Sequence, residues 1–307
     1  MRFAPNEDQA AFLAVLDQMT EAPEAGWKAS PDWSRFDWSD AFDSLLADNG
    51  FFDCALEPTL GLTAAAAMTC RLAGLPVLVE AAASSMLRSR WGQSLPRPVA
   101  VIDRDAGRAV PFLPVARSLV MIGTDAVSVA AVAAGDFEPV DSLYAYPMGR
   151  LAPGARIAWS KIDDDPQLVR TAWRTALAAE LAGVLKGGLD AVVAHVTQRH
   201  QFGRPLGAFQ AIQHRLAASA TKIEATRWLA LRAAQTQDAG DAAMAIGYGQ
   251  EASTKVIYDL HQFMGAMGLT LEHPLHRWTY RARLLRAAMG GSAANMTEFF
   301  VRRWGAS

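Results

Sequence analysis

The feature that most constrains the fold is a helical spacing of apolar residues that begins near residue 163 and continues towards the end of the chain. Asp165-Pro166 predicts where the first helix begins, because proline suits the first helical position. Apolar residues then recur three and four positions apart, which is typical of a helix that packs on its neighbours. They are Leu181, Val184, Leu185, Leu189, Val192, Val193 and Val196.

Further helices of this kind are expected after Pro205, from about Asp241 to Met264, from near Pro274, and close to the C-terminus. Long helices joined by short connections pack as antiparallel bundles. We therefore predict that residues 163–307 form a C-terminal four-helix bundle.

Residues 1–95 are also predicted to be helical, as an N-terminal domain. Asn6 and Gln9 have the spacing of a capping box at a helix start, and Asn49-Gly50 is a typical helix stop. The Ala-rich stretch 61–91 predicts two more buried helices.

Residues 96–162, between these two helical regions, have short apolar runs separated by Asp, Gly and Pro. The runs at 99–102, 118–122 and 126–129 predict short strands. We expect a small antiparallel β domain here. The predicted fold class is mainly α, with a reduced middle β domain between a helical N-terminal domain and a helical bundle.

The composition argues against several classes of protein. The chain has 307 residues and a formal net charge of −2, which argues against nucleic acid as the main partner. No apolar run approaches the ~20 residues of a membrane span, and the N-terminus lacks the pattern of a secretory signal. Cys54 and Cys70 predict buried thiols, and the six histidines show no metal-ligand spacing. These features predict a cytoplasmic protein without a metal site.

Two stretches carry residues suited to binding a ligand. The first contains Arg199, Phe202, Gly203 and Gln210, where one long helix is expected to end and the next to begin. A helix start exposes free N–H groups that suit an anion, and Arg199 adds a charge-assisted bond to a phosphate. The ordinary alternative is a helix–turn–helix corner with a solvated arginine.

The second stretch is rich in small residues and follows the helix that is expected to end near Met264. It contains Gln262, Gly265, Ala266 and Gly268. Small residues allow another molecule to approach the backbone closely. The ordinary alternative is a helix C-terminal cap followed by a loop.

Together, the two stretches resemble the C-terminal domain of the flavin-dependent acyl-CoA dehydrogenase family. That family has an R-x-x-F-G corner with a Gln eleven residues after the Arg, and later a Q-x-x-G-G-x-G loop followed by T/N-x-E-x-P. In this sequence Ala266 replaces the second Gly of the loop, and the resemblance covers about residues 165–305. The matching residues are Arg199, Phe202, Gly203, Gln210, Gln262, Gly265, Gly268, Glu272 and Pro274.

The resemblance implies a helix–barrel–helix fold and an oxidoreductase that introduces a double bond into an acyl-CoA thioester. In the family, a carboxylate removes the α proton while the β hydride passes to FAD. The corner and the loop reach across a subunit interface to the pyrophosphate and adenosine of the neighbour's FAD. The cofactor contacts implied for this chain are Arg199, Phe202, Gln210, Gln262, Gly265 and Ala266.

The catalytic base of the family has no counterpart in this sequence. The position of the usual Glu falls on Met289, and the position used by some other members falls on Trp173. Neither side chain accepts a proton at neutral pH. Glu180 and Asp190 lie elsewhere on the same predicted helix, and we expect both to be solvated or salt-bridged.

The segment that touches the flavin ring in the family, T-E-x-x-x-G-S, has no counterpart between Trp91 and Val110, and the chain is shorter than a complete member. The resemblance therefore implies an incomplete subunit, of the β type, that supplies FAD contacts to a complete acyl-CoA dehydrogenase subunit. The acyl-CoA dehydrogenases of bacterial steroid side-chain degradation are heterotetramers of this kind. They suggest a steroid side-chain CoA ester as substrate, with electron-transfer flavoprotein as a candidate electron acceptor.

Two other hypotheses remain open. A self-sufficient, homo-oligomeric flavoenzyme would need a relocated base, for which His273 and His276 are candidates because histidine titrates near neutral pH. A flavin-free interaction or scaffold subunit is favoured by Ala266 and opposed by the intact corner at Arg199. Activity of the chain alone would support the first hypothesis, and flavin content that is unchanged by Arg199→Ala would support the second.

Overall fold

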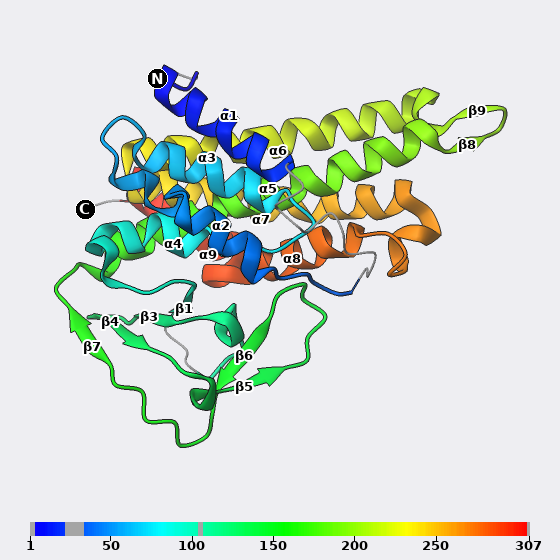
Figure 1. Cartoon of the computed structure of the whole chain (residues 1–307). Coiled ribbons are helices and arrows are strands. Elements are labelled where there is room, and N and C mark those ends of the chain that lie inside the picture. The colour runs from blue at the N-terminus through cyan, green and yellow to red at the C-terminus, as the bar shows by residue number, and fades with distance from the viewer. Residues whose placement is uncertain (1–3, 22–33, 104–106, 306–307) are drawn as a thin grey trace.

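Helices make up most of the molecule, and a small β region lies to one side of them (Figure 1). The computed structural model describes residues 4–21, 34–103 and 107–305. A helical N-terminal part, a β middle part and a long helical bundle follow one another along the chain, which confirms the predicted fold class. Among the described helices, none combines the length and the low charge that a membrane span requires.

The N-terminal part is built from short helices. The predicted capping box is present: Asn6 Oδ1 accepts a hydrogen bond from the Gln9 N–H at 2.7 Å, and Gln9 Oε1 accepts one from the Asn6 N–H at 3.1 Å. Ser39 caps the next helix by accepting from the Phe42 N–H. The helices are α1 (Glu7–Glu21), α2 (Asp40–Asp48), α3 (Gly61–Ala73) and α4 (Ala82–Met86), with the 3-10 segments η3 (Phe51–Leu56) and η4 (Arg88–Ser94).

The described strands of the middle part form two small sheets, with the orders β1-β3-β4-β7 and β2-β6-β5. The prediction of an antiparallel region is wrong for one pair, because β1 and β3 run parallel with Val99 opposite Ser118. Between them the chain contributes β2 to the other sheet, which is the kind of long connection that a parallel pair needs. The strands are β1 (Val99–Asp103), β2 (Val110–Pro111), β3 (Ser118–Ile122), β4 (Val127–Ala131), β5 (Phe137–Val140), β6 (Met148–Leu151) and β7 (Ser160–Ile162).

A buried carboxyl group joins the N-terminal helices to the first sheet. Glu80 accepts hydrogen bonds from the Ala83 N–H at the start of α4 and from the Val99 N–H in β1. Burial raises the pKa of Glu80 to about 7, and the nearby charge of Arg97 acts in the opposite direction. Arg97 also binds Asp43 at 2.6 Å, so α2 is tied to the same junction.

The C-terminal bundle surrounds α5, a helix of 33 residues. Asp165 caps its start and Pro166 occupies its first turn, as predicted. Because α3, α4, α6, α7 and α8 all pack on α5, this helix is buried around most of its circumference. The C-terminal elements are α5 (Pro166–Gln198), β8 (His200–Gln201), β9 (Arg204–Pro205), α6 (Gln210–Thr236), α7 (Ala239–Met264), α8 (Leu275–Ala287) and α9 (Gly291–Trp304).

Two glycines bring α5 into close contact with the N-terminal part. A Cβ atom at Gly183 would lie 2.1 Å from the Cys70 carbonyl oxygen, and one at Gly187 would lie 2.3 Å from that of Gly74. Trp278 of α8 donates its indole N–H to the same Gly74 carbonyl at 2.9 Å. This contact fixes the N-terminal helices on the bundle.

Both cysteines are buried and unpaired, as predicted. Burial raises the pKa of the Cys54 thiol to about 12 and that of the Cys70 thiol to about 11. Both thiols are therefore protonated at neutral pH, and a protonated thiol is a poor nucleophile.

Candidate functional site

The first candidate site is a hairpin that protrudes beyond the ends of α5 and α6 (Figure 1). Arg199 ends α5: its N–H donates to the His195 carbonyl at 2.8 Å, and its own carbonyl accepts from the Leu206 N–H at 2.8 Å. Between these bonds β8 pairs with β9, and Phe202 and Gly203 form the turn with φ angles of 54° and 79°. Two consecutive left-handed residues fit the tight turn of a two-residue hairpin.

The hairpin exposes an aromatic ring together with positive charge. Phe202 is 88% exposed, and its ring stands edge-on to that of Phe209 with the centroids 6.1 Å apart. The Arg204 guanidinium lies 4.0 Å from the centre of the Phe209 ring. Arg199 is exposed and has no ion pair with any residue that the structure describes. An exposed aromatic ring beside uncompensated charge is typical of a surface that another molecule covers.

The second candidate site is the turn that ends α7. Gly265 has a φ of 64°, and its N–H donates to the His261 carbonyl, so the helix ends in a conformation that favours glycine. Ala266 follows in the 3-10 segment η8 (Gly265–Leu269) and is exposed. Gln262 is also exposed, and its Oε1 accepts a hydrogen bond from the Tyr258 hydroxyl at 3.4 Å. The turn therefore presents backbone and amide groups to solvent.

The two sites lie at the same end of the bundle, since α5 runs towards this end, α6 returns from it and α7 approaches it again (Figure 1). Arg215 of α6 pairs with Asp259 of α7, and its guanidinium lies 4.6 Å from the centre of the Phe263 ring. Burial, and then the charge of His195, lower the pKa of His273. The end of α5 therefore lies close to the loop that follows α7.

This end of the bundle suits a ligand that bears phosphates. Helix-start N–H groups and an unpaired arginine attract negative charge, and side-chain amides supply further hydrogen bonds. The structure thus gathers at one exposed end the residues for which the sequence predicted FAD contacts, and these contacts stay a prediction. The residues are Arg199, Phe202, Gln210, Gln262, Gly265 and Ala266.

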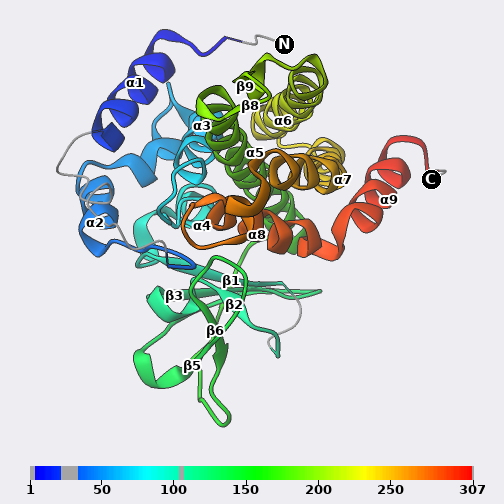
Figure 2. The ribbon, with the colours of Figure 1, turned by 90° about the vertical axis from the view of Figure 1, so that its right-hand side faces the viewer.

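A cavity of about 620 Å³ lies elsewhere, between the bundle and the strands. Figures 1 and 2 both show α4 and α8 on the side of the bundle that faces these strands. Met289 and Trp173, the two positions that correspond to the catalytic base of the family, both line the cavity. A thioether and an indole do not accept protons at neutral pH, so neither position can supply the base.

The expectation that Glu180 is solvated or salt-bridged is wrong. Its side chain is buried, and Oε1 accepts a hydrogen bond from the Tyr146 hydroxyl at 2.7 Å. Burial raises the pKa of Glu180, and Tyr146 and Arg281 act in the opposite direction. Glu180 and Tyr146 both line the cavity. One sequence signal was available, because Trp173, Leu177 and Glu180 have the spacing of a single helix face.

The other candidate bases lie outside this cavity. The ring nitrogens of His276 contact the His273 and Ser34 carbonyls at 3.0 and 3.1 Å, and neither histidine is among the described residues that line the cavity. Asp190 binds Lys186 at 2.6 Å on the surface, as expected. In the described ranges, no three His, Cys, Asp or Glu side chains cluster in a way that could hold a metal ion.

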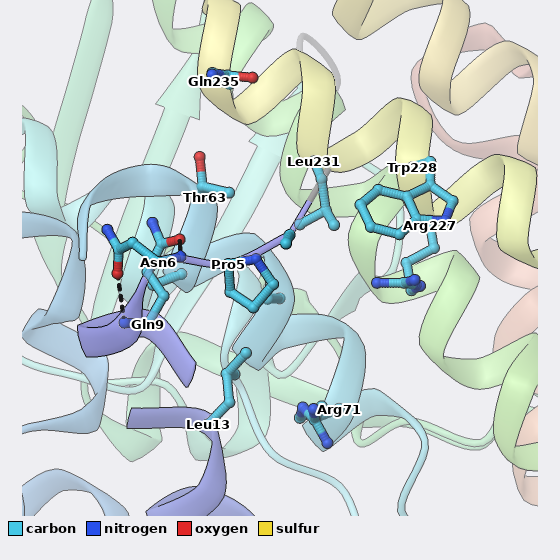
Figure 3. Close-up of a pocket in the computed structure, with 13 residues that line it drawn as sticks. Pro5, Asn6, Gln9, Leu13, Thr63, Arg71, Arg227, Trp228, Leu231 and Gln235 are labelled. Carbon is cyan, nitrogen blue, oxygen red and sulfur yellow. Dashed lines mark hydrogen bonds between the residues drawn. The ribbon is translucent and has the colours of Figure 1, made fainter. Parts of the chain in front are cut away.

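A further hollow, of about 550 Å³, lies between α1, α3 and α6 (Figure 3). Arg71 and Arg227 line it together with Trp228. Both arginines are paired with carboxylates, Arg71 with Asp17 at 2.6 Å and Arg227 with Glu224 at 2.8 Å. None of the residues for which the sequence predicted ligand contacts or catalysis lines this hollow, so it is not the candidate site.

The C-terminal bundle matches a known protein family. Residues 171–304 match the family described as acyl-CoA dehydrogenase, C-terminal domain. This range contains the hairpin, the turn at the end of α7, and the positions of Trp173 and Met289.

Curated relatives are similar over a limited part of this chain. Acyl-CoA dehydrogenase FadE34 of Mycobacterium tuberculosis is 35% identical over 142 residues, which are 42% of this chain and 20% of the relative. Acyl-CoA dehydrogenase IpdE2 of Mycolicibacterium smegmatis is 35% identical over 133 residues, which are 43% of this chain and 42% of the relative. The matched part of this chain therefore spans less than half of the length of either relative.

Solved structures extend the similarity to the whole fold. A chain of the ChsE4-ChsE5 complex from Mycobacterium tuberculosis has a TM-score of 0.79 at 20% identity and covers 100% of both chains. A chain of the Tcur3481-Tcur3483 steroid ACAD has a TM-score of 0.74 at 21% identity and covers 96% of this chain and 97% of its own. A structure of the electron transferring flavoprotein of Acidaminococcus fermentans contains a chain with a TM-score of 0.74 at 17% identity, covering 100% of both chains. Because the sequence identities are only 17–21%, these structures show that this chain shares their fold.

Proposed function

We propose that this chain, which has the acyl-CoA dehydrogenase fold and the C-terminal domain of that family, is the incomplete subunit of a heteromeric FAD-dependent acyl-CoA dehydrogenase. A complete partner subunit holds the flavin ring and the base, and this chain holds the pyrophosphate and adenosine. One contrast carries the proposal. Binding groups such as Arg199 stand exposed at the bundle end, whereas Met289 and Trp173 occupy the cavity where a base is expected.

The assigned reaction introduces an α,β double bond into an acyl-CoA thioester, and bound FAD supplies the hydride acceptor. The part of this chain in that reaction is to bind and orient. Arg199 neutralises phosphate charge, and the amides of Gln210 and Gln262 hydrogen-bond to the cofactor. Phe202 covers apolar surface at the subunit contact. No proton transfer is assigned to this chain at Met289, because a thioether cannot accept one.

The relatives support a partner subunit and a substrate class. Two solved structures of this fold are complexes of two differently named chains, ChsE4-ChsE5 and Tcur3481-Tcur3483, and the second is a steroid ACAD. By extension, we assign this chain to a heterotetramer that acts on a steroid side-chain CoA ester. We also propose an electron transferring flavoprotein as the electron acceptor, as the resemblance to the family suggests.

Co-expression with a complete acyl-CoA dehydrogenase chain from the same genome tests the proposal. We expect the co-purified complex to show flavin absorbance and to oxidise an acyl-CoA, whereas this chain alone does neither. Dehydrogenase activity of the chain alone, on any acyl-CoA, contradicts the proposal. A complex that forms without flavin supports the scaffold alternative instead.

A second candidate function, a self-sufficient homo-oligomeric dehydrogenase, is favoured by one observation. Glu180 lines the same cavity as Met289, and a carboxyl group with a raised pKa suits proton transfer near neutral pH. Glu180→Gln decides between the two functions. If the chain alone is active and this variant is not, Glu180 is the base and no partner is needed.

A further inference from the structure

The hollow between α1, α3 and α6 lies apart from the cavity beside the strands, and the two share none of their described lining residues (Figure 3). Its volume of about 550 Å³ is in the range of small-molecule sites. Such sites combine apolar walls with a few polar groups that orient the ligand. The polar groups of this hollow therefore indicate which ligand fits it.

The hollow is a groove with two different ends. On α3, Thr63 and Arg71 are eight residues apart, and the same spacing separates Arg227 from Gln235 on α6, so each helix supplies about 12 Å of wall. Figure 3 shows Thr63 and Gln235 in the upper part of the view. The two arginines lie lower down, so one end of the groove is neutral and the other is cationic. The apolar residues of the lining are Ala4, Pro5, Leu13, Ala64, Ala67, Trp228 and Leu231.

Each arginine of the groove keeps hydrogen-bond donors for a ligand. Arg71 uses only Nη1 in its bonds to Asp17, and Arg227 uses Nε and Nη2 in its bonds to Glu224. A guanidinium has five N–H donors. Nε and Nη2 of Arg71 and Nη1 of Arg227 therefore have no acceptor in the part of the chain that the structure describes. An anion can bind here without displacing either carboxylate.

The charges around the cationic end indicate what kind of anion fits. Asp17 and Glu224 balance the charges of Arg71 and Arg227, although neither carboxylate is among the described residues that line the hollow. A phosphate monoester, which carries almost two negative charges at neutral pH, is repelled by these carboxylates. A carboxylate carries one charge, and its two oxygens match the N–H groups of a guanidinium. A single carboxylate is therefore the anion that suits this end.

We propose that this hollow is a second ligand site, which binds an elongated, apolar carboxylic acid with a hydrogen-bonding group at its far end. Arg71 and Arg227 hold the carboxylate, Ala67 and Leu231 contact the apolar body, and Thr63 lies near the far group. The inference goes beyond the proposed function, because this site needs neither FAD nor a partner subunit.

Calorimetric titration of the full chain with ω-hydroxydecanoate tests the inference, because this extended acid is about as long as the groove. We expect saturable binding, and the double variant Arg71→Gln/Arg227→Gln should bind about tenfold or more weakly, because charge-assisted hydrogen bonds are lost. The matched control is Arg35→Gln/Arg232→Gln, which removes the same charge from two exposed ion pairs outside the hollow. Its affinity should stay within about twofold of that of the unmodified chain.

Two further measurements separate the parts of the site. The corresponding α,ω-decanediol has the same apolar body without the carboxylate, and we expect it to bind about tenfold or more weakly than the acid. Ala67→Leu leaves both arginines in place and fills the middle of the groove, so it should abolish binding of the acid.

Four results overturn the inference: no saturable binding of the acid to the unmodified chain, equal affinity for the diol, unchanged affinity in the Arg71→Gln/Arg227→Gln variant, or an equal loss in the control variant. Because neither flavin nor a partner subunit takes part, this test can fail while the flavin of the complex still supports the proposed function, and the reverse also holds.

Discussion

The exposed end of the bundle and the cavity beside the strands differ at the positions that the family uses for binding and for catalysis. At the bundle end, Arg199 has no acidic partner among the described residues and Phe202 is 88% exposed. In the cavity, Met289 and Trp173 stand where a base is expected, and the carboxyl group of Glu180 is bonded to a tyrosine. The difference teaches that the groups equipped for binding face outwards, where only another molecule can use them.

The largest effect that tests this comparison is expected from Arg199→Ala in the co-purified complex. Loss of a charge-assisted bond to phosphate costs about 1.5–3 kcal/mol, which is roughly a 10- to 100-fold weaker affinity for FAD. Met289→Ala, on the cavity side, should change the affinity by less than about twofold, because it removes no hydrogen bond to phosphate. Flavin fluorescence titration measures both. If both variants lost FAD affinity to the same extent, the distinction between the bundle end and the cavity would be contradicted.

Glu80, which also lines the cavity, predicts a pH dependence of stability. Burial raises its pKa to about 7 from 4.5, so the folded state favours the protonated form. The protonated carboxyl group of Glu80 therefore stabilises the folded state, fully below pH 4.5 and no longer once the pH has risen through 7. The free energy of unfolding should fall by roughly 2–3 kcal/mol between pH 5 and 8. Urea denaturation at each pH measures the slope, and Glu80→Gln should flatten it. A slope that persists in the variant contradicts this origin.

Tyr146→Phe tests the comparison at a residue that lines the cavity. It removes the hydroxyl that donates to Glu180 and leaves a buried acceptor unpaired, so the free energy of unfolding should fall by about 1–3 kcal/mol. The kcat of the complex should stay unchanged, because the cavity of this chain does no chemistry in our account. Loss of kcat without loss of stability would show that the cavity is part of the reaction.

Phe202→Gly has the smallest expected effect on this chain alone. Phe202 has a φ of 54° and is 88% exposed, so glycine relieves left-handed strain and removes little packing. The free energy of unfolding should change by less than about 1 kcal/mol, in either direction. Binding of the partner, measured by analytical ultracentrifugation, should weaken. A large loss of stability in the chain alone would mean that the ring packs internally.

The features that the sequence predicted correctly are local ones. Asn6 and Gln9 form the capping box, and Asp165-Pro166 starts α5, because each depends on residues within one turn of each other. The corner at Arg199 and the turn at Gly265 were predicted for the same reason, whereas the short strands β8 and β9 were not predicted. Their gathering at one end of the bundle then follows from the alternating direction of three long helices. The domain boundaries stay a prediction.

The features that were missed depend on contacts between distant segments. The parallel pairing of β1 with β3 depends on a connection that passes through the other sheet, and short apolar runs do not encode it. The burial of Glu180 depends on Tyr146, which is 34 residues away in the sequence.

The number of flavins per pair of chains tests the central claim most directly. If only the partner subunit can hold a flavin ring, a purified complex of equal amounts of both chains contains one FAD per pair, and this chain alone contains none. Flavin absorbance after denaturation, divided by the protein concentration, gives this number. Two FAD molecules per pair, or stoichiometric FAD in the isolated chain, would contradict the account.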